Sequence, residues 1–181
     1  DQVTAAKISN NEDFNINSVT VGKGANAVAG NTVLGESALD ASVSGGDNTA
    51  IGKDALTSNT SGAFNTALGG LSLKSNTTAS FNTAIGYRSL DANTSGASNT
   101  AVGLYSLLKN TTASNNTAVG NNSLAQNTTG GFCVAVGSGA LDANTTANNN
   151  VAVGYNALTA NTTGTTNVGI GTAVFSSKHN C

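Results

Sequence analysis

Few residues in this 181-residue chain carry side chains suited to catalysis or metal binding. The single histidine, His179, has no acidic neighbour, so a nucleophile activated by an imidazole base is not expected. The aspartates Asp40, Asp91 and Asp142 recur only every 51 residues, unlike the closely spaced aspartates of calcium-binding β-rolls. No glycine-rich phosphate loop occurs. We therefore expect a protein that is not an enzyme and that uses no metal ion or cofactor.

The composition excludes further classes of function. Charged residues make up 9% of the chain, well below the roughly one quarter that is usual for soluble domains. The net charge of −2 offers no basic surface to nucleic acid or to an anionic membrane. No apolar run approaches the ~18 residues of a membrane span. Nucleic acid is thus not an expected partner, and membrane insertion is not expected either.

The elements that position any site come from an internal repeat of 17 residues. The motif Asn-Thr-Ala-(Ile/Val/Leu)-Gly begins nine times at this interval without an insertion or deletion. Its first positions are Asn31, Asn48, Asn65, Asn82, Asn99, Asn116, Cys133, Asn150 and Asn167. A leucine recurs with the same step from Leu39 to Leu158, with Phe175 in the ninth place, and an Asn-Thr pair recurs from Asn59 to Asn161.

A unit of 17 residues is too short for a pair of helices, but it fits one coil of a β-solenoid. We expect an all-β fold, a parallel β-solenoid of about nine coils spaced ~4.8 Å apart, giving a rod of roughly 43 Å. The array covers residues 19–172, with regular units from residue 31 and a shorter first unit at Val19–Gly22. Residues 1–18 form an N-terminal cap or linker, and residues 173–181 form an irregular tail.

Strand alternation sets the expected inside and outside of each coil. We expect the aliphatic column that contains Ile85 to fill the interior and the small-residue column that contains Ala84 to face outward. A column of small residues lets another backbone approach closely, which predicts a homo-oligomer with Ala101 at the interface. A slim monomer with exposed alanines is the alternative.

Two features of the repeat leave alternatives open. Glycine and alanine alternate strictly at one position, beginning with Gly62 and Ala79, so the structural unit is either 17 or 34 residues long. Cys133 and Cys181 are a candidate disulfide, but 48 residues correspond to nearly three coils, or roughly 13 Å. An intrachain bridge would require the tail to fold back, whereas two free thiols or an interchain bridge through Cys181 need no such fold.

The stretch from Asn82 to Leu90, Asn-Thr-Ala-Ile-Gly-Tyr-Arg-Ser-Leu, resembles repeats of bacteriophage tail-fibre and tailspike-like proteins. It is also similar to the left-handed β-roll repeats in the heads of trimeric autotransporter adhesins. The resemblance covers Val19–Thr172, and Asn167–Thr172 is similar to the segment that closes such arrays. It implies a homotrimeric fibre, extracellular on a virion tail or a bacterial cell surface, that gives reach and attachment to a host or surface glycan. The self-cleaving chaperone domain of that family has no counterpart here, so no catalytic residue carries over.

Recognition is expected where the repeat varies, at the positions after each glycine. The candidates are Tyr87, Arg88, Tyr105 and Tyr155, because aromatic rings can stack on the faces of sugars. An ice-binding solenoid is the alternative function, in which regular threonine and asparagine columns would face the ice lattice. Its candidate residues, which would otherwise form a turn ladder, are Thr60, Thr77, Thr94, Thr111, Thr128, Thr145 and Thr162.

Overall fold

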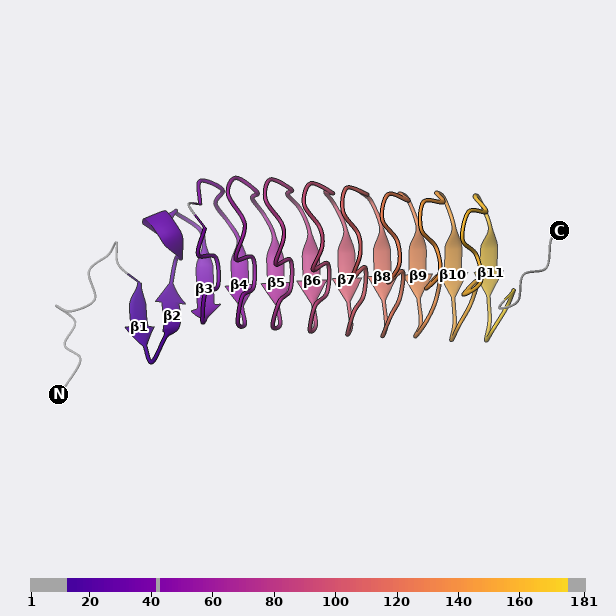
Figure 1. Ribbon diagram of the computed structural model, residues 1–181, viewed down its shortest axis with the longest axis horizontal. Helices are drawn as coiled ribbons and strands as arrows, with labels where there is room; N and C mark the ends of the chain where they lie inside the picture. The colour runs from indigo at the N-terminus through magenta and orange to yellow at the C-terminus, as the bar shows by residue number, and fades with distance from the viewer. Residues whose placement is uncertain (1–12, 42, 176–181) are drawn as a thin grey trace.

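In the computed structural model the chain forms a row of stacked coils, and the structure describes residues 13–41 and 43–175 (Figure 1). The N-terminal end of the row carries a hairpin of β1 (Phe14–Ile16) and β2 (Val19–Gly22), followed by the short 3-10 turn η2 (Ala25–Ala27). The coils contribute one short strand each. These strands are β3 (Thr32–Gly35), β4 (Thr49–Ile51), β5 (Thr66–Leu68), β6 (Thr83–Ile85), β7 (Thr100–Val102), β8 (Thr117–Val119), β9 (Val134–Val136), β10 (Val151–Val153) and β11 (Val168–Ile170).

Strands β3 to β11 form one parallel sheet in which each residue pairs with its counterpart 17 positions later, as Ala84 does with Ala101. The nine parallel strands of the described chain are separated by eight complete turns, which confirms the predicted all-β solenoid. Strand β2 runs antiparallel to β3, and β1 runs antiparallel to β2. The prediction that Val19–Gly22 forms a shorter first coil is therefore wrong, because this segment belongs to a hairpin at the end of the sheet.

The strand residues that face the interior of the coil are the opposite set from the one expected. Ala84 is fully buried, whereas Ile85 is 36% exposed, and the same order repeats along the sheet. The prediction that the alanine column faces outward is thus wrong. Ala101 lies inside the coil rather than at an outer surface.

The leucine ladder explains why alanine lies inside. Each leucine from Leu39 to Leu158 is buried and enters the coil from the segment opposite the strand. At Gly169, which takes the place of an alanine, an added Cβ would lie 2.7 Å from Cγ of Leu158. The interior therefore holds one large side chain per coil, and the strand must supply a small one where it faces that leucine. The leucines adopt left-handed backbone angles, with φ near +50°, so the turn itself aims them inward.

Two asparagine ladders hold the coils together. In the turn after the leucine, Nδ2 of Asn93 donates to Oδ1 of Asn76 at 3.0 Å, and the pattern continues through Asn110. In the ladder that precedes the strands, the backbone N–H of Asn99 donates to Oδ1 of Asn82 at 2.9 Å. Both ladders are buried, so each satisfied amide avoids a desolvation penalty of ~1–3 kcal/mol.

The glycine–alanine alternation reflects a true two-coil unit at one turn. A Cβ at Gly96 would collide with the main-chain carbonyl oxygen of Ala113 in the next coil. One residue further on, the N–H of Ala97 donates to Oγ of Ser114 at 2.9 Å, and the equivalent bond recurs two coils later at Gly131. The strands thus repeat every 17 residues, whereas the hydrogen bonding of this turn repeats every 34.

Candidate functional site

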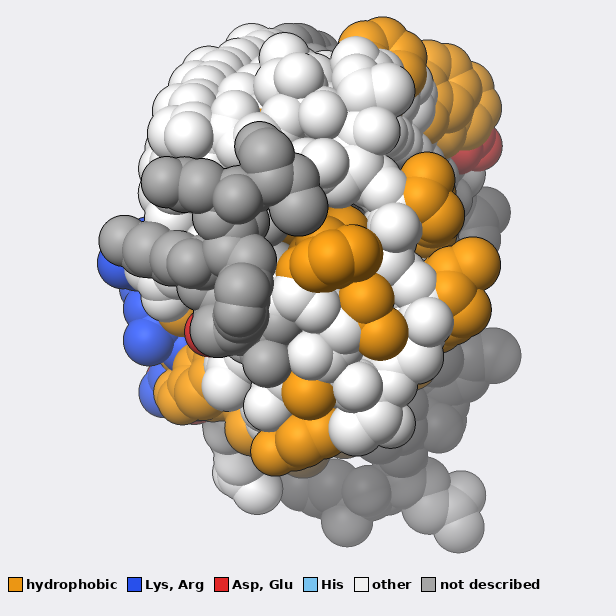
Figure 2. Space-filling model, turned by 90° about the vertical axis from the view of Figure 1, so that its right-hand side faces the viewer, with side chains coloured by type: hydrophobic (Ala, Val, Ile, Leu, Met, Phe, Trp, Pro, Cys, Tyr) orange, Lys and Arg blue, Asp and Glu red, His pale blue; other side chains and the backbone are white. Residues whose placement is uncertain are grey.

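The first candidate site is the outward side of the parallel sheet, which we call the strand face. It consists of the first and third residues of the strands β3 to β11, such as Thr83 and Ile85. Its aliphatic members include Leu68, Ile85 and Val136, which are 36–42% exposed, and it contains no charged residue. Looking onto the C-terminal end, Figure 2 shows hydrophobic side chains gathered mainly on one side of the coil and Lys and Arg on the other. An uncharged surface with a continuous aliphatic column is suited to contact with another surface.

The second candidate site lies at the turn that follows the strands, and we call it the aromatic corner. It contains Tyr87, Arg88 and Tyr105, three of the four residues predicted for recognition, together with Asp91. The rings of Tyr87 and Tyr105 are 6.0 Å apart between centroids and inclined at 65°. The guanidinium carbon of Arg88 lies 6.0 Å from the centroid of the Tyr105 ring, and Nε of Arg88 donates to Oδ2 of Asp91 at 2.6 Å.

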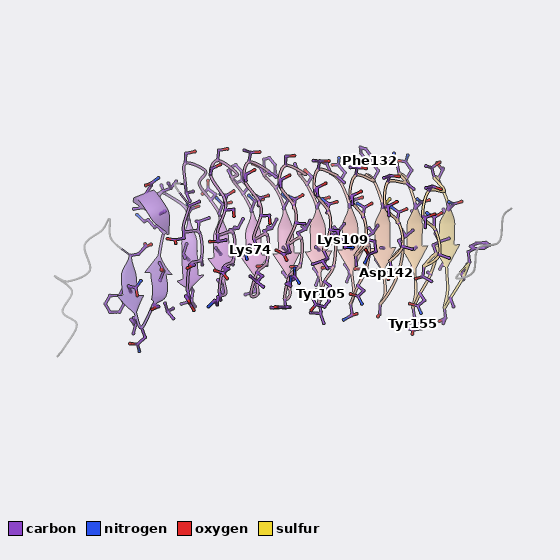
Figure 3. The ribbon with its side chains drawn as sticks, in the orientation of Figure 1. Lys74, Tyr105, Lys109, Phe132, Asp142 and Tyr155 are labelled. Carbon is purple, nitrogen blue, oxygen red and sulfur yellow. The ribbon has the colours of Figure 1, made fainter. Side chains whose placement is uncertain are left out.

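Tyr155, the fourth residue predicted for recognition, is not part of this corner. It is exposed at the same edge of the solenoid, beyond Tyr105 (Figure 3). Figure 3 also places Phe132 at the opposite edge, where Phe64 and Phe81 stack with parallel rings 5.2 Å apart. These three exposed phenylalanines immediately precede the strand motif and extend the apolar surface beyond it.

The side-chain hydroxyls of the predicted threonine ladder are used in hydrogen bonds within the turn. In six of its seven threonines, all except Thr162, the hydroxyl donates to the main-chain carbonyl oxygen of the threonine in the next coil, as from Thr94 to Thr111 at 3.1 Å. The bonds of Thr60, Thr77, Thr111, Thr128 and Thr145 follow the same pattern. The strand-face threonines, such as Thr83, have no such bond to the described residues.

Cys133 takes the place of an asparagine in the buried ladder that precedes the strands. Its Sγ lies 3.4 Å from the carbonyl oxygen of Ala147, and burial raises the pKa of its thiol. It is a free thiol, and its proposed partner Cys181 lies outside the described residues. The backbone N–H of Asn150 faces the sulfur, a weak acceptor, where the other coils present an amide oxygen.

Cys133→Asn is expected to stabilise the fold by about 1–2 kcal/mol. The new Oδ1 would accept from the N–H of Asn150, and the new Nδ2 would donate to Ala147, as the asparagine of the preceding coil, Asn116, does with Cys133 and Gly130. Urea denaturation followed by circular dichroism measures the change, with Cys133→Ala as the control that removes the sulfur without restoring the amide. A Cys133→Asn variant no more stable than Cys133→Ala would contradict the role given to the ladder.

Three further charged residues lie at, or one residue after, the positions equivalent to Asp91 in other coils. Lys74, Lys109 and Asp142 occupy the middle of the solenoid in Figure 3. Partial burial raises the pKa of the Asp142 carboxyl, and the positive charge of Lys109 opposes that rise. A carboxyl with a raised pKa in the folded state destabilises the fold progressively as the pH rises above the unfolded value.

Asp142→Asn is therefore expected to stabilise the protein at pH 7 and to change nothing at pH 3. At pH 3 the wild-type carboxyl is protonated in both states, so the amide and the acid are equivalent. Thermal melts of both proteins at the two pH values measure the difference. A variant that is less stable at pH 7 would show that attraction to Lys109 outweighs the cost of burial.

Within residues 13–41 and 43–175 there is no group of three or more His, Cys, Asp or Glu side chains placed to hold a metal ion. The same residues include no helix with the length and hydrophobicity needed to cross a membrane.

No protein-family model matches the chain, and comparisons with curated proteins and with solved structures also give no match. The repeating solenoid and its asparagine ladders are observed in the structure itself.

The strand face and Asp91 were missed by reasoning from the sequence. The face was assigned to the interior because alternation alone does not distinguish the two sides of a strand. Asp91 carries a signal that was present in the sequence, since it lies three residues after the only arginine. At a turn, this spacing brings the two side chains into contact.

Proposed function

We propose that this chain is a non-catalytic structural fibre module, the shaft of a phage tail fibre or of a bacterial cell-surface adhesin. It would be extracellular and would give reach and attachment to a host or surface glycan. The strand face is the observation that carries the proposal, because it places an uncharged, partly exposed aliphatic residue on every coil. Such a surface favours association with a second apolar surface.

The partner that fits this face best is another copy of the same chain. A surface that repeats once per coil is matched along its whole length only by a surface with the same axial spacing. With no charged residue in either column, two copies would meet without like-charge repulsion. The resemblance to trimeric adhesin heads gives three as the number of copies, so we propose a homotrimer.

Sedimentation equilibrium tests this function. The expected mass is three times the 17.7 kDa of the monomer, and Val102→Arg on the strand face should reduce it to the monomer mass while the β-sheet spectrum remains. A wild-type mass of 17.7 kDa at micromolar concentration would reject the shaft proposal.

Ice binding is the second candidate, and the same strand face favours it. Its threonine column from Thr32 to Thr117 and its aliphatic column form a regular array with hydroxyls that make no bond to the described residues. In the last three coils valine replaces this threonine, which favours association over ice binding. Thermal hysteresis in a monomeric sample would support ice binding, whereas a trimer without hysteresis would reject it.

A further inference from the structure

The aromatic corner departs from the repeat in a way that the fold does not require. The positions equivalent to Arg88 hold serine, aspartate, leucine, tyrosine, asparagine, glycine and alanine in the other coils. Those equivalent to Asp91 hold threonine, lysine, leucine, alanine or aspartate. Because the coils stack with the same register whatever occupies these positions, the ion pair is not needed to build the solenoid.

The ion pair also adds little to the stability of the fold. The side chain of Asp91 is only 10% exposed, whereas that of Arg88 is 41% exposed. Burying a carboxylate carries a desolvation cost that an ion pair with a largely solvated partner scarcely offsets. The pair does have a clear geometric effect, because it fixes the exposed guanidinium beside the Tyr105 ring.

The corner presents polar groups that the protein leaves unused. Only Nε of Arg88 is bonded to Asp91, so its two terminal nitrogens make no hydrogen bond to the described residues. The hydroxyls of Tyr87 and Tyr105 are also without a bond to that part of the chain. Next to the half-exposed Tyr87 ring lies Gly70, where an added Cβ would be 3.5 Å from Cδ2 of Tyr87. The glycine thus leaves open the space beside this ring.

We propose that the aromatic corner binds a neutral hexopyranose unit of a surface polysaccharide, an inference that rests on the proposed attachment function. Tyrosine rings carry negative faces, which suit the slightly positive C–H groups on one side of a pyranose ring. The tyrosine hydroxyls and the terminal nitrogens of Arg88 supply hydrogen bonds to sugar hydroxyls, in the manner of apolar sites with a few placed polar groups. Asp91 offsets the charge of Arg88, so the ion pair itself offers no net positive charge to an acidic sugar.

Titration of the whole 181-residue chain with sugar, monitored by tyrosine fluorescence, tests the proposal. The signal is specific because the chain has three tyrosines and no tryptophan, and two of the three lie in the corner. The probes are oligosaccharides of glucose, of galactose and of N-acetylglucosamine, each titrated alone, with oligogalacturonate as the acidic comparison. We expect saturable binding of at least one neutral probe and weaker binding of the acidic one.

Four variants locate the site. Tyr87→Ala and Tyr105→Ala are each expected to raise the Kd at least about tenfold. Asp91→Asn, which removes a positioning residue, should raise the Kd severalfold with an unchanged melting temperature. Tyr155→Ala is the matched control, since Tyr155 is exposed at the same edge but outside the corner, and its Kd should stay within twofold of the wild-type value.

Three results would overturn the proposal: no saturable binding of any neutral probe, an equal loss in Tyr155→Ala, or tighter binding of oligogalacturonate. Sedimentation equilibrium on the same samples separates this failure from failure of the shaft. A trimer that binds no sugar overturns only the sugar site, whereas a monomer that binds sugar overturns only the shaft.

Discussion

Replacing Ala101 with arginine is expected to prevent the solenoid from folding. Ala101 is fully buried in the centre of the sheet and belongs to the column that faces the leucine ladder. An arginine there would place an unpaired charge and a large side chain in a space that holds only a methyl group. The cost exceeds about 4 kcal/mol, a large part of the 5–15 kcal/mol that stabilises a typical domain. Circular dichroism should show loss of the β-sheet spectrum.

Val102→Arg is the matched control for that variant. It changes the next residue of the same strand to the same amino acid, but its side chain belongs to the strand face. The charge would stay in contact with water, so the monomeric variant should keep its β-sheet circular dichroism spectrum and melt cooperatively. If Ala101→Arg folded and Val102→Arg did not, the inside and outside of the coil would have been assigned the wrong way round.

Gly69→Ala is expected to destabilise the fold by at least about 3 kcal/mol. Gly69 has a φ of +136°, in a region that residues with a side chain rarely adopt. An added Cβ would also lie 2.5 Å from the carbonyl oxygen and 2.7 Å from the carbonyl carbon of Gly86 in the next coil. Both atoms belong to the main chain, which is hydrogen-bonded to the neighbouring coils on either side of Gly86, so neither can move away without separating two coils. Urea denaturation measures the loss.

Gly70→Ala, one residue further on, separates these causes from the general effect of losing a glycine. Gly70 is not among the glycines with positive φ, and its nearest added contact is an ordinary 3.5 Å. The variant should lie within about 1 kcal/mol of the wild type, on the stable side if anything. Equal losses of stability in Gly69→Ala and Gly70→Ala would show that close approach of the coils is not the cause of the destabilisation at Gly69.

The residues of the aromatic corner show how much of the candidate site could be predicted from the sequence. Tyr87, Arg88 and Tyr105 are predicted for recognition because they occupy positions where the repeat varies, and the structure brings these three together. Tyr155 met the same criterion but lies elsewhere along the edge, because distance along the solenoid axis depends on the number of coils between two residues. The part played by Asp91 depends on a side-chain contact that no repeat pattern encodes.

The sequence by itself determined the register of this protein. Coils that stack must be equal in length, so an unbroken 17-residue period fixed the parallel sheet, the place of each strand and the asparagine ladders. Only the tertiary structure decided which side of the strand is the interior. Alternation defines two faces, but the choice between Ala84 and Ile85 depends on the leucine that enters from across the coil, aimed there by a left-handed turn. Because that leucine fills the available space, the aliphatic column lies on the outside of the coil. This exposed column is the observation on which the proposed fibre function rests.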